Sequence, residues 1–171
     1  MLVITPEKCE WHKSRVNFLG YIISAIGVEM DQEKIKTVLE WDAPETVKDI
    51  QLFLGFANFY WRFIEGYSKL TCPLTDLTKR SEKFFRSVEC DKAFQELKSR
   101  FTSAPILKHL DPHLPCIIEC AASEFVIGAI LSQKCDGCLH PVAFHSRKMN
   151  KQEINYEIHD KELLGITSAF K

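Results

Sequence analysis

Two patterns of side chains in this sequence could support chemistry, and the first centres on a carboxylate. Glu162 follows Ile158 by four residues and precedes Ile166 by four, so a helix here would place all three on one stripe. We expect this stripe to face a sheet, where an unpaired carboxylate carries a desolvation cost. Metal binding would explain a carboxylate in that place. An exposed glutamate at the edge of the stripe is the alternative.

The second pattern is a possible binding surface on an earlier helix. Gln51, Gly55 and Phe59 are spaced by four residues and therefore share one helix face. A glycine inside a helix costs about 1 kcal/mol relative to alanine, so this position needs an explanation. Close packing of a neighbouring helix is one explanation. The other is close approach of a ligand to the helix backbone.

The elements that would position these residues begin with strands. Val16, Phe18 and, after Gly20, residues 21–23 form one β-prone segment, and residues 27–30 form a second one after a turn.

Three helices are expected to follow and to form a small bundle. Asp31 is a candidate N-cap for the first helix, which Pro44 ends. Thr46 and Asp49 form a capping box that begins the second helix, and Gly66 ends it. The third, shorter helix is indicated by an apolar series with a proline in its first turn, namely Leu70, Pro73, Leu74 and Leu77.

The second half of the chain is expected to form a separate unit, and we place the boundary at the polar residues 79–83. Ser87 is a candidate cap for a helix that Pro105 closes. Asn150 opens a further helix that continues to the last residue. Three strands lie between these helices, at about 115–122, 126–133 and 140–146.

Composition bounds the function and the location. The net charge is -1, with 22 basic and 23 acidic residues, so any attraction to nucleic acid must come from a local group of residues. The apolar runs are too short for a membrane span, and the N-terminus has no signal-peptide pattern. We therefore expect an intracellular protein, cytoplasmic or nuclear.

The seven cysteines are expected to be reduced thiols. Cys135 and Cys138 have the spacing of a metal knuckle, and His140 is near them. A zinc site requires four ligands, however, and no second Cys/His pair follows at a usual interval. The intervening Asp136-Gly137 favours a hairpin turn instead.

Several segments resemble, in the right order, the Pol polyprotein of gypsy-class long-terminal-repeat retroelements. The sequence FLGY (18–21) resembles the primer-grip hairpin of the reverse transcriptase palm, VKDIQLFLGFANF (47–59) resembles the thumb helix, and PCIIECAASEFVIGAILSQ (115–133) resembles the opening of a ribonuclease H domain. The resemblance implies an α+β fold in three parts. These are the end of the palm with a small β-hairpin (1–30), a three-helix thumb-like bundle (31–82), and an RNase H-like mixed α/β domain truncated at the C-terminus (83–171).

The resemblance also implies a nucleic-acid partner, either an RNA–DNA hybrid or a template–primer duplex. Gln51 would hydrogen-bond to base or sugar edges, Gly55 would let the backbone approach, and Phe59 would pack on the sugars. The family usually has arginine where this chain has Trp61, so one phosphate contact is missing. The remaining residues of the implied binding set are Phe18, Leu19, Gly20, Tyr21 and Arg62.

The resemblance implies Mg²⁺ chemistry in the intact family, but this chain lacks most of the required residues. The polymerase aspartates precede the primer grip in the family, and this sequence contains no Asp-Asp pair. Ala121 stands at the place of the first RNase H aspartate, and a methyl group cannot bind a cation. Glu119 is on the order of 6–7 Å along the strand from that place, too far to substitute. We expect no cofactor in this chain, with Glu162 as a vestigial catalytic residue and metal ligand.

Three hypotheses about function follow. The first is a retroelement-derived reverse transcriptase/RNase H-like fragment that is catalytically inactive, in effect a pseudoenzyme. The second is a retained nucleic-acid-binding or interaction module. The third is one piece of an active Pol polyprotein whose remainder is encoded beside it.

Overall fold

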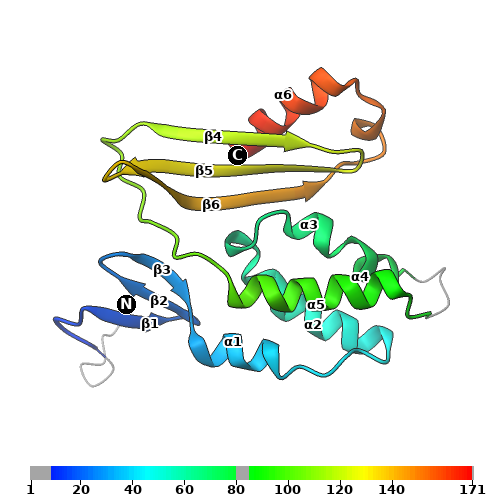
Figure 1. Ribbon diagram of the computed structural model, residues 1–171, viewed down its shortest axis with the longest axis horizontal. Coiled ribbons are helices and arrows are strands. Elements are labelled where there is room, and N and C mark those ends of the chain that lie inside the picture. Colours follow the sequence, from blue (N-terminus) through cyan, green and yellow to red (C-terminus); the bar gives the residue numbers. More distant parts are fainter. Residues whose placement is uncertain (1–8, 80–84, 171) are drawn as a thin grey trace, which may run out of the picture.

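The computed structural model describes residues 9–79 and 85–170, which form two three-stranded antiparallel sheets and several helices (Figure 1). The first half contains β1 (Arg15–Phe18), β2 (Tyr21–Ser24), β3 (Gly27–Met30), α1 (Gln32–Leu39), α2 (Val47–Phe59), the 3₁₀ helix η2 (Trp61–Phe63), α3 (Tyr67–Leu70) and α4 (Cys72–Asp76). The second half contains α5 (Val88–Thr102), β4 (Cys116–Ala122), β5 (Val126–Cys135), β6 (Cys138–Lys148), η3 (Glu153–Asn155) and α6 (Ile158–Ala169). The expected α+β fold is confirmed.

The first sheet is a meander of three strands in the order β1-β2-β3. Leu19 and Gly20 have φ angles of 52° and 81°, so they form a two-residue turn in which Phe18 pairs with Tyr21. The expectation of one β-prone segment that includes residues on both sides of Gly20 is therefore wrong, whereas the hairpin implied for residues 18–21 is present. The turn divides that segment into two antiparallel strands.

The helix N-caps expected from the sequence are confirmed. The Asp31 side chain accepts a hydrogen bond from the backbone N–H of Glu33. Thr46 and Asp49 form a reciprocal capping box at the start of α2, with N···O distances of 2.9 and 3.2 Å. The Ser87 side chain caps α5.

Two of the expected helix ends are wrong, and long-range contacts explain both. Helix α1 ends at Leu39, well before Pro44, and the carbonyl oxygen of Trp41 accepts a hydrogen bond from Lys98 Nζ at 2.8 Å. Helix α2 ends at Phe59, because Tyr60 leaves the helical conformation and its buried side chain reaches the β1–β2 turn. The expected third helix is two short helices, α3 and α4.

One hydrophobic core joins the bundle to α5. Phe94, Leu97 and Phe101 of α5 are buried, and the ring of Phe94 lies 4.7 Å from that of Phe53 in α2. Helix α5 contacts α1, α3 and α4, so it packs as part of the bundle (Figure 1). The division of the chain into three parts stays a prediction, since most of its second boundary, residues 80–83, lies outside the described residues.

The second sheet has the strand order β4-β5-β6, and its three strands confirm the sequence expectation. Asp136 and Gly137 have φ angles of 52° and 83°, so the expected hairpin turn is confirmed as well. Among residues 9–79 and 85–170, no group of three His, Cys, Asp or Glu side chains could hold a metal ion. No helix within the described part of the chain is long and apolar enough to cross a membrane.

The expected helix from Asn150 to the C-terminus is wrong in its first third. The side chain of Asn150 accepts hydrogen bonds from the backbone of Gln152 and Glu153, which starts only the 3₁₀ helix η3. Tyr156 is then extended, with ψ of 150°, and α6 begins two residues later.

Helix α6 is held on the second sheet by a polar network. Ser168 Oγ lies 3.1 Å from His145 Nε2 and accepts a hydrogen bond from Arg147 Nε at 3.0 Å. The Arg147 guanidinium also binds both carboxylate oxygens of Glu153, at 2.8 and 2.9 Å. The second sheet, α6 and the segment between them are therefore connected through two neighbouring residues of β6.

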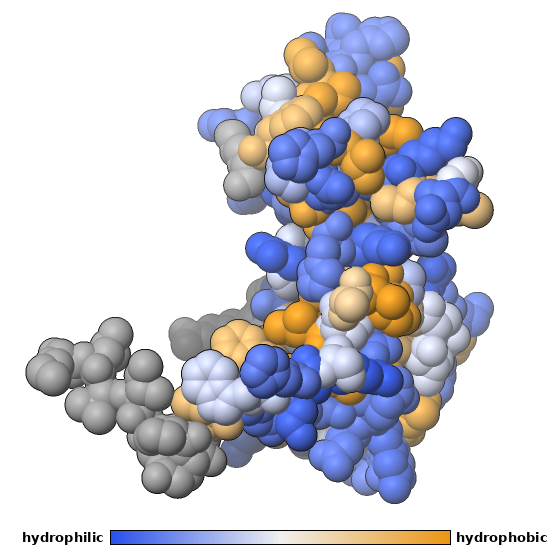
Figure 2. All heavy atoms as spheres, turned by 90° about the vertical axis from the view of Figure 1, so that its left-hand side faces the viewer, coloured by the Kyte–Doolittle hydropathy of each residue, from blue (hydrophilic) through white to orange (hydrophobic). Residues whose placement is uncertain are grey.

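The segment after α5 connects the two sheets. Leu107 pairs with Val28 of β3 through hydrogen bonds of 2.8 and 2.9 Å. The next residue, Lys108, donates its backbone N–H to the carbonyl of Pro141 in β6 at 2.9 Å. Figure 2 shows the narrow waist between the lobe of the second sheet and the lobe of the bundle.

We predict that Gly27→Ala destabilises the fold strongly. Gly27 has a φ of 148°, and a Cβ there would lie 2.2 Å from the carbonyl oxygen of Leu107. The free energy of unfolding in urea should fall by about 2 kcal/mol or more. Gly66→Ala is the control, since Gly66 also has a positive φ but open space around it. Equal losses for the two variants would contradict the close approach of Leu107.

We also predict that stability falls as the pH decreases below about 6.5, the ordinary histidine value. Burial lowers the pKa of His145, and the nearby Arg147 cation lowers it further. The folded state therefore binds fewer protons than the unfolded state. The stability that neutral His145 contributes is fully present above the unfolded pKa and is lost as the pH falls toward the folded pKa. The urea midpoint should change less between pH 7 and 5.5 in His145→Gln than in the wild-type chain. His159→Gln, at an exposed position, should keep the wild-type change.

Candidate nucleic-acid interface

The two faces of α2 differ in exposure, and the residues singled out in the sequence lie on the exposed one. Gln51, Gly55 and Phe59 are exposed. The opposite face is buried in the core and consists of Ile50, Phe53 and Ala57. The structure therefore brings the three candidate residues of α2 onto one solvent-facing stripe.

Gly55 has no neighbour that would require a glycine. A Cβ added there would meet nothing within 4 Å. The explanation by close packing of a neighbouring helix is therefore wrong within the described part of the chain. The helix accepts a cost of about 1 kcal/mol at this position without a gain in packing.

Aromatic side chains hold the β1–β2 turn against the C-terminal end of this stripe. The rings of Tyr21 and Phe59 stack with centroids 4.9 Å apart, and the Tyr21 hydroxyl donates to the carbonyl of Phe59 at 2.9 Å. The Tyr60 hydroxyl donates to the carbonyl of Gly20 at 3.2 Å. Burial raises the pKa of Tyr60 to about 12, so the donor stays protonated at neutral pH.

Close packing requires a glycine at position 20 of the turn. A Cβ at Gly20 would lie 2.8 Å from the Tyr60 hydroxyl, and the φ of 81° is unfavourable for other residues. Phe18 and Leu19 at the tip are 56% and 70% exposed. The turn therefore presents apolar side chains to solvent beside the end of α2.

Arg62 adds a cation next to this turn. It is exposed, and its guanidinium carbon lies 5.5 Å from the centroid of the Trp61 ring. Burial raises the pKa of the Tyr21 hydroxyl, and the nearby positive charge of Arg62 offsets part of that increase. All eight candidate binding residues of the sequence analysis thus lie on α2, on η2 or at the β1–β2 turn.

Sequence reasoning missed two contributions to this surface. Lys48 is exposed three residues before Gln51 and seven before Gly55, so it extends the stripe by one turn. Its helical spacing could have revealed it. Phe63 stacks on Tyr21 with centroids 5.7 Å apart, and nothing in the local pattern indicates that contact.

Within the described residues 85–170, the carboxylates do not assemble with other side chains into a metal site. On β4, Glu119 and Ala121 are exposed, whereas Cys120 between them is half-buried toward α6, where a Cβ on Gly165 would lie 3.6 Å from its Cβ. Side chains alternate along a strand, so Glu119 and Ala121 lie on the face away from α6.

The expectation that Glu162 points toward the sheet is wrong. Glu162, Ile158 and Ile166 are all exposed, and the side of α6 that packs on the sheet contains Gly165 and Ser168. The chemistry of these residues does not fit a pair of Mg²⁺ ions, which needs several carboxylates in one cluster.

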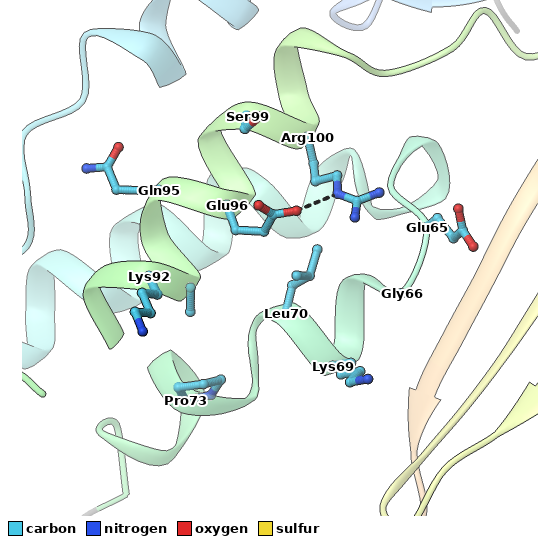
Figure 3. A pocket seen from close by; sticks show the side chains of 11 residues that line it. Glu65, Gly66, Lys69, Leu70, Pro73, Lys92, Gln95, Glu96, Ser99 and Arg100 are labelled. Carbon is cyan, nitrogen blue, oxygen red and sulfur yellow. Dashed lines mark hydrogen bonds and ion pairs between the residues drawn. The ribbon is translucent and has the colours of Figure 1, made fainter. Parts of the chain in front are cut away.

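A groove of about 990 Å³ lies elsewhere on the bundle, between α3, α4 and α5 (Figure 3). Its walls mix Lys69 and Lys92 with acidic side chains, and Arg100 is bound by Glu96 at 2.8 Å. Charges of both signs and one internal ion pair give no convergent set for catalysis. The groove is separate from the α2 surface.

Comparison with known proteins decides the family. Residues 87–171 match the model of the RNase H-like domain found in reverse transcriptase. The Transposon Tf2-3 and Tf2-4 polyproteins of Schizosaccharomyces pombe (strain 972 / ATCC 24843) are each 39% identical over 171 residues, which is 99% of this chain. The chain belongs to the gypsy-class retroelement Pol family. It spans 13% of the length of these two polyproteins.

Solved structures support the fold of this Pol-family chain. The foamy viral protease–reverse transcriptase dRH in complex with double-stranded DNA matches with a TM-score of 0.78 and 24% identity, over 92% of this chain and 28% of that one. The foamy viral protease–reverse transcriptase in complex with an RNA/DNA hybrid matches with a TM-score of 0.76 and 23% identity, over 92% of this chain and 22% of that one. At these identities the likeness concerns the fold alone.

Proposed function

We propose that this chain binds a nucleic-acid duplex, of template–primer or RNA–DNA hybrid type, through the exposed stripe of α2 and the β1–β2 turn. In this proposal the bundle is the thumb, and the first sheet is the primer-grip end of the palm. The observation that carries the proposal is Gly55, a glycine inside a helix, in open space between an exposed amide and an exposed aromatic ring.

Each position on the stripe offers a different interaction with a duplex. The Gln51 amide has both donors and acceptors for base or sugar edges. Gly55 has no side chain, so a strand can approach the helix backbone closely. Phe59 is 48% exposed and offers an apolar ring edge to sugars, and its stacking on Tyr21 fixes the ring.

Cations at both ends of the stripe are suited to phosphates. Lys48 lies at the N-terminal end of α2 and Arg62 follows its C-terminal end, and both are exposed. With a net charge of -1, the chain has no general attraction for polyanions. Binding by this surface should therefore be weak and should decrease steeply as salt is added.

We further propose that the chain has no nuclease or polymerase activity by itself. Ala121 and the exposed Glu162 provide one carboxylate at two family ligand positions, and two neighbouring dications need more negative charge than that. The alternative is that the chain is one piece of an active polyprotein. Because the chain spans 13% of the length of the Tf2-3 polyprotein, the adjoining genomic sequence is the place to test this alternative. A Tyr-x-Asp-Asp motif upstream and two aspartates downstream would support that alternative.

We predict that Gln51→Ala and Phe59→Ala each weaken binding to an RNA–DNA hybrid by about fivefold or more, since each removes an interaction of about 1 kcal/mol. Fluorescence anisotropy at low salt measures the affinity. Gln95→Ala is the matched control, because Gln95 is an exposed glutamine on α5. If neither variant of the α2 stripe binds more weakly than the control, the proposed surface is wrong.

Gly55→Ala should separate stability from binding. Alanine fits at both Gly55 and Gly165 and favours the helix, so either variant should raise the free energy of unfolding by about 0.5–1 kcal/mol. Only the variant at Gly55 should weaken hybrid binding, because its methyl group lies where the strand approaches. Equal hybrid affinities for the two stabilised variants would show that the backbone at Gly55 is not a contact.

We predict no Mg²⁺-dependent cleavage of a labelled RNA–DNA hybrid by the purified chain. Ala121→Asp alone should not create activity, because the added carboxylate lies on the face of β4 away from α6. Gel analysis of the labelled strand is the measurement. Cleavage that Glu162→Gln abolishes would contradict this prediction and favour the active-polyprotein alternative.

A further inference from the structure

The turn between β5 and β6 places two thiols directly opposite each other. Cys135 and Cys138 are Cα partners in the antiparallel ladder, and only Asp136 and Gly137 separate them. The positive φ angles of these two residues, 52° and 83°, define a tight two-residue turn. Cys138 is exposed, Cys135 is half-buried, and both are free thiols.

This arrangement meets the Cα distance requirement of a disulfide. Directly opposed residues of an antiparallel pair have Cα atoms about 4.5–5.5 Å apart, and disulfides span Cα distances of about 4.4–6.8 Å. The side chains of opposed residues also leave the same face of the sheet. Formation of the bond therefore requires no change of strand register.

The neighbouring Cys116 is placed less well for the same reaction. It pairs with Gln133, two residues before Cys135, and its sulfur lies 3.5 Å from Gln133 Nε2. Diagonal neighbours of this kind are about 7–8 Å apart, beyond the range of an unstrained disulfide. A zinc knuckle is also disfavoured, since the described residues include no group of three metal ligands.

We propose that Cys135 and Cys138 form a thiol–disulfide exchange site that reacts with low-molecular-weight disulfides. The thiolate of the exposed Cys138 attacks one sulfur of the small disulfide, forms a mixed disulfide and expels one small thiolate. The thiolate of Cys135 then attacks the Cys138 sulfur, closes the Cys135–Cys138 bond and expels the second small thiolate. The protein loses two electrons and two protons, and the small disulfide is reduced to two thiols.

The product is a covalent cross-link at the tip of the β5–β6 hairpin. It joins the end of β5 to the start of β6, and the other end of β6 contacts α6 through His145 and Arg147. This site is independent of the proposed duplex-binding surface, which lies on the bundle. The reaction is thus a modification of the RNase H-like half alone.

The test equilibrates the full 171-residue chain with buffers of oxidised and reduced glutathione. Mass spectrometry of proteolytic peptides quantifies the Cys135–Cys138 bond. We expect the equilibrium constant for its formation to be at least about tenfold higher in the folded chain than in urea, a difference of about 30 mV in potential. Cys116→Ser should leave this constant unchanged, and Cys138→Ser should leave only a glutathione adduct at Cys135.

Gly137→Val tests the contribution of the turn. Valine is unfavourable at the φ of 83°, so the constant of the folded variant should fall toward the value in urea. Circular dichroism establishes that the variant is folded, and if it is not, the comparison of the folded wild-type chain with the same chain in urea decides. Equal constants for folded and unfolded wild-type chain, or a dominant bond between Cys116 and Cys135, would overturn the proposal.

Discussion

The structure depends on the burial of one face of α5. Phe94, Leu97 and Phe101 lie almost fully out of solvent, and each such side chain contributes about 1.5–3 kcal/mol when it is removed from water. The partner surface is the inner face of the bundle, above all Phe53 of α2. This burial fixes which face of α2 is inside. It thereby decides that the opposite face, with Gln51, Gly55 and Phe59, is left to solvent.

The exposed stripe of α2 departs from what stability alone would select. A glycine in open space weakens the helix, and Leu52 and Phe59 are 57% and 48% exposed. Local departures from the rules of helix formation tend to occur where a protein binds something. The second half of the chain shows no comparable surface, since Glu119 on β4 and Glu162 on α6 are both exposed and lie apart from any described group of metal ligands.

Local chemistry was predictable from the sequence, because it depends on a few neighbouring residues. The caps at Asp31, Thr46 and Ser87 and the turn at Asp136-Gly137 all follow from side chains within three positions of one another. Helix ends were predicted poorly, since distant residues set them. Lys98, for example, is 57 residues away from the Trp41 carbonyl that it binds.

The orientation of α6 shows where periodicity is insufficient. Apolar residues occur on more than one side of this helix, so spacing alone selected the row of Ile158 and Ile166. The side that packs on the sheet instead has the small residues Gly165 and Ser168, which allow a close approach. The exposed stripe of α2, by contrast, was predictable. Its polar and aromatic positions recur at helical spacing opposite a wholly apolar row.

Leu107 and Lys108 are consecutive residues whose backbones bond to different sheets, one to β3 and the other to β6. A single peptide unit between them leaves almost no slack. The two sheets are therefore coupled through one peptide unit, and no flexible tether separates their attachment points.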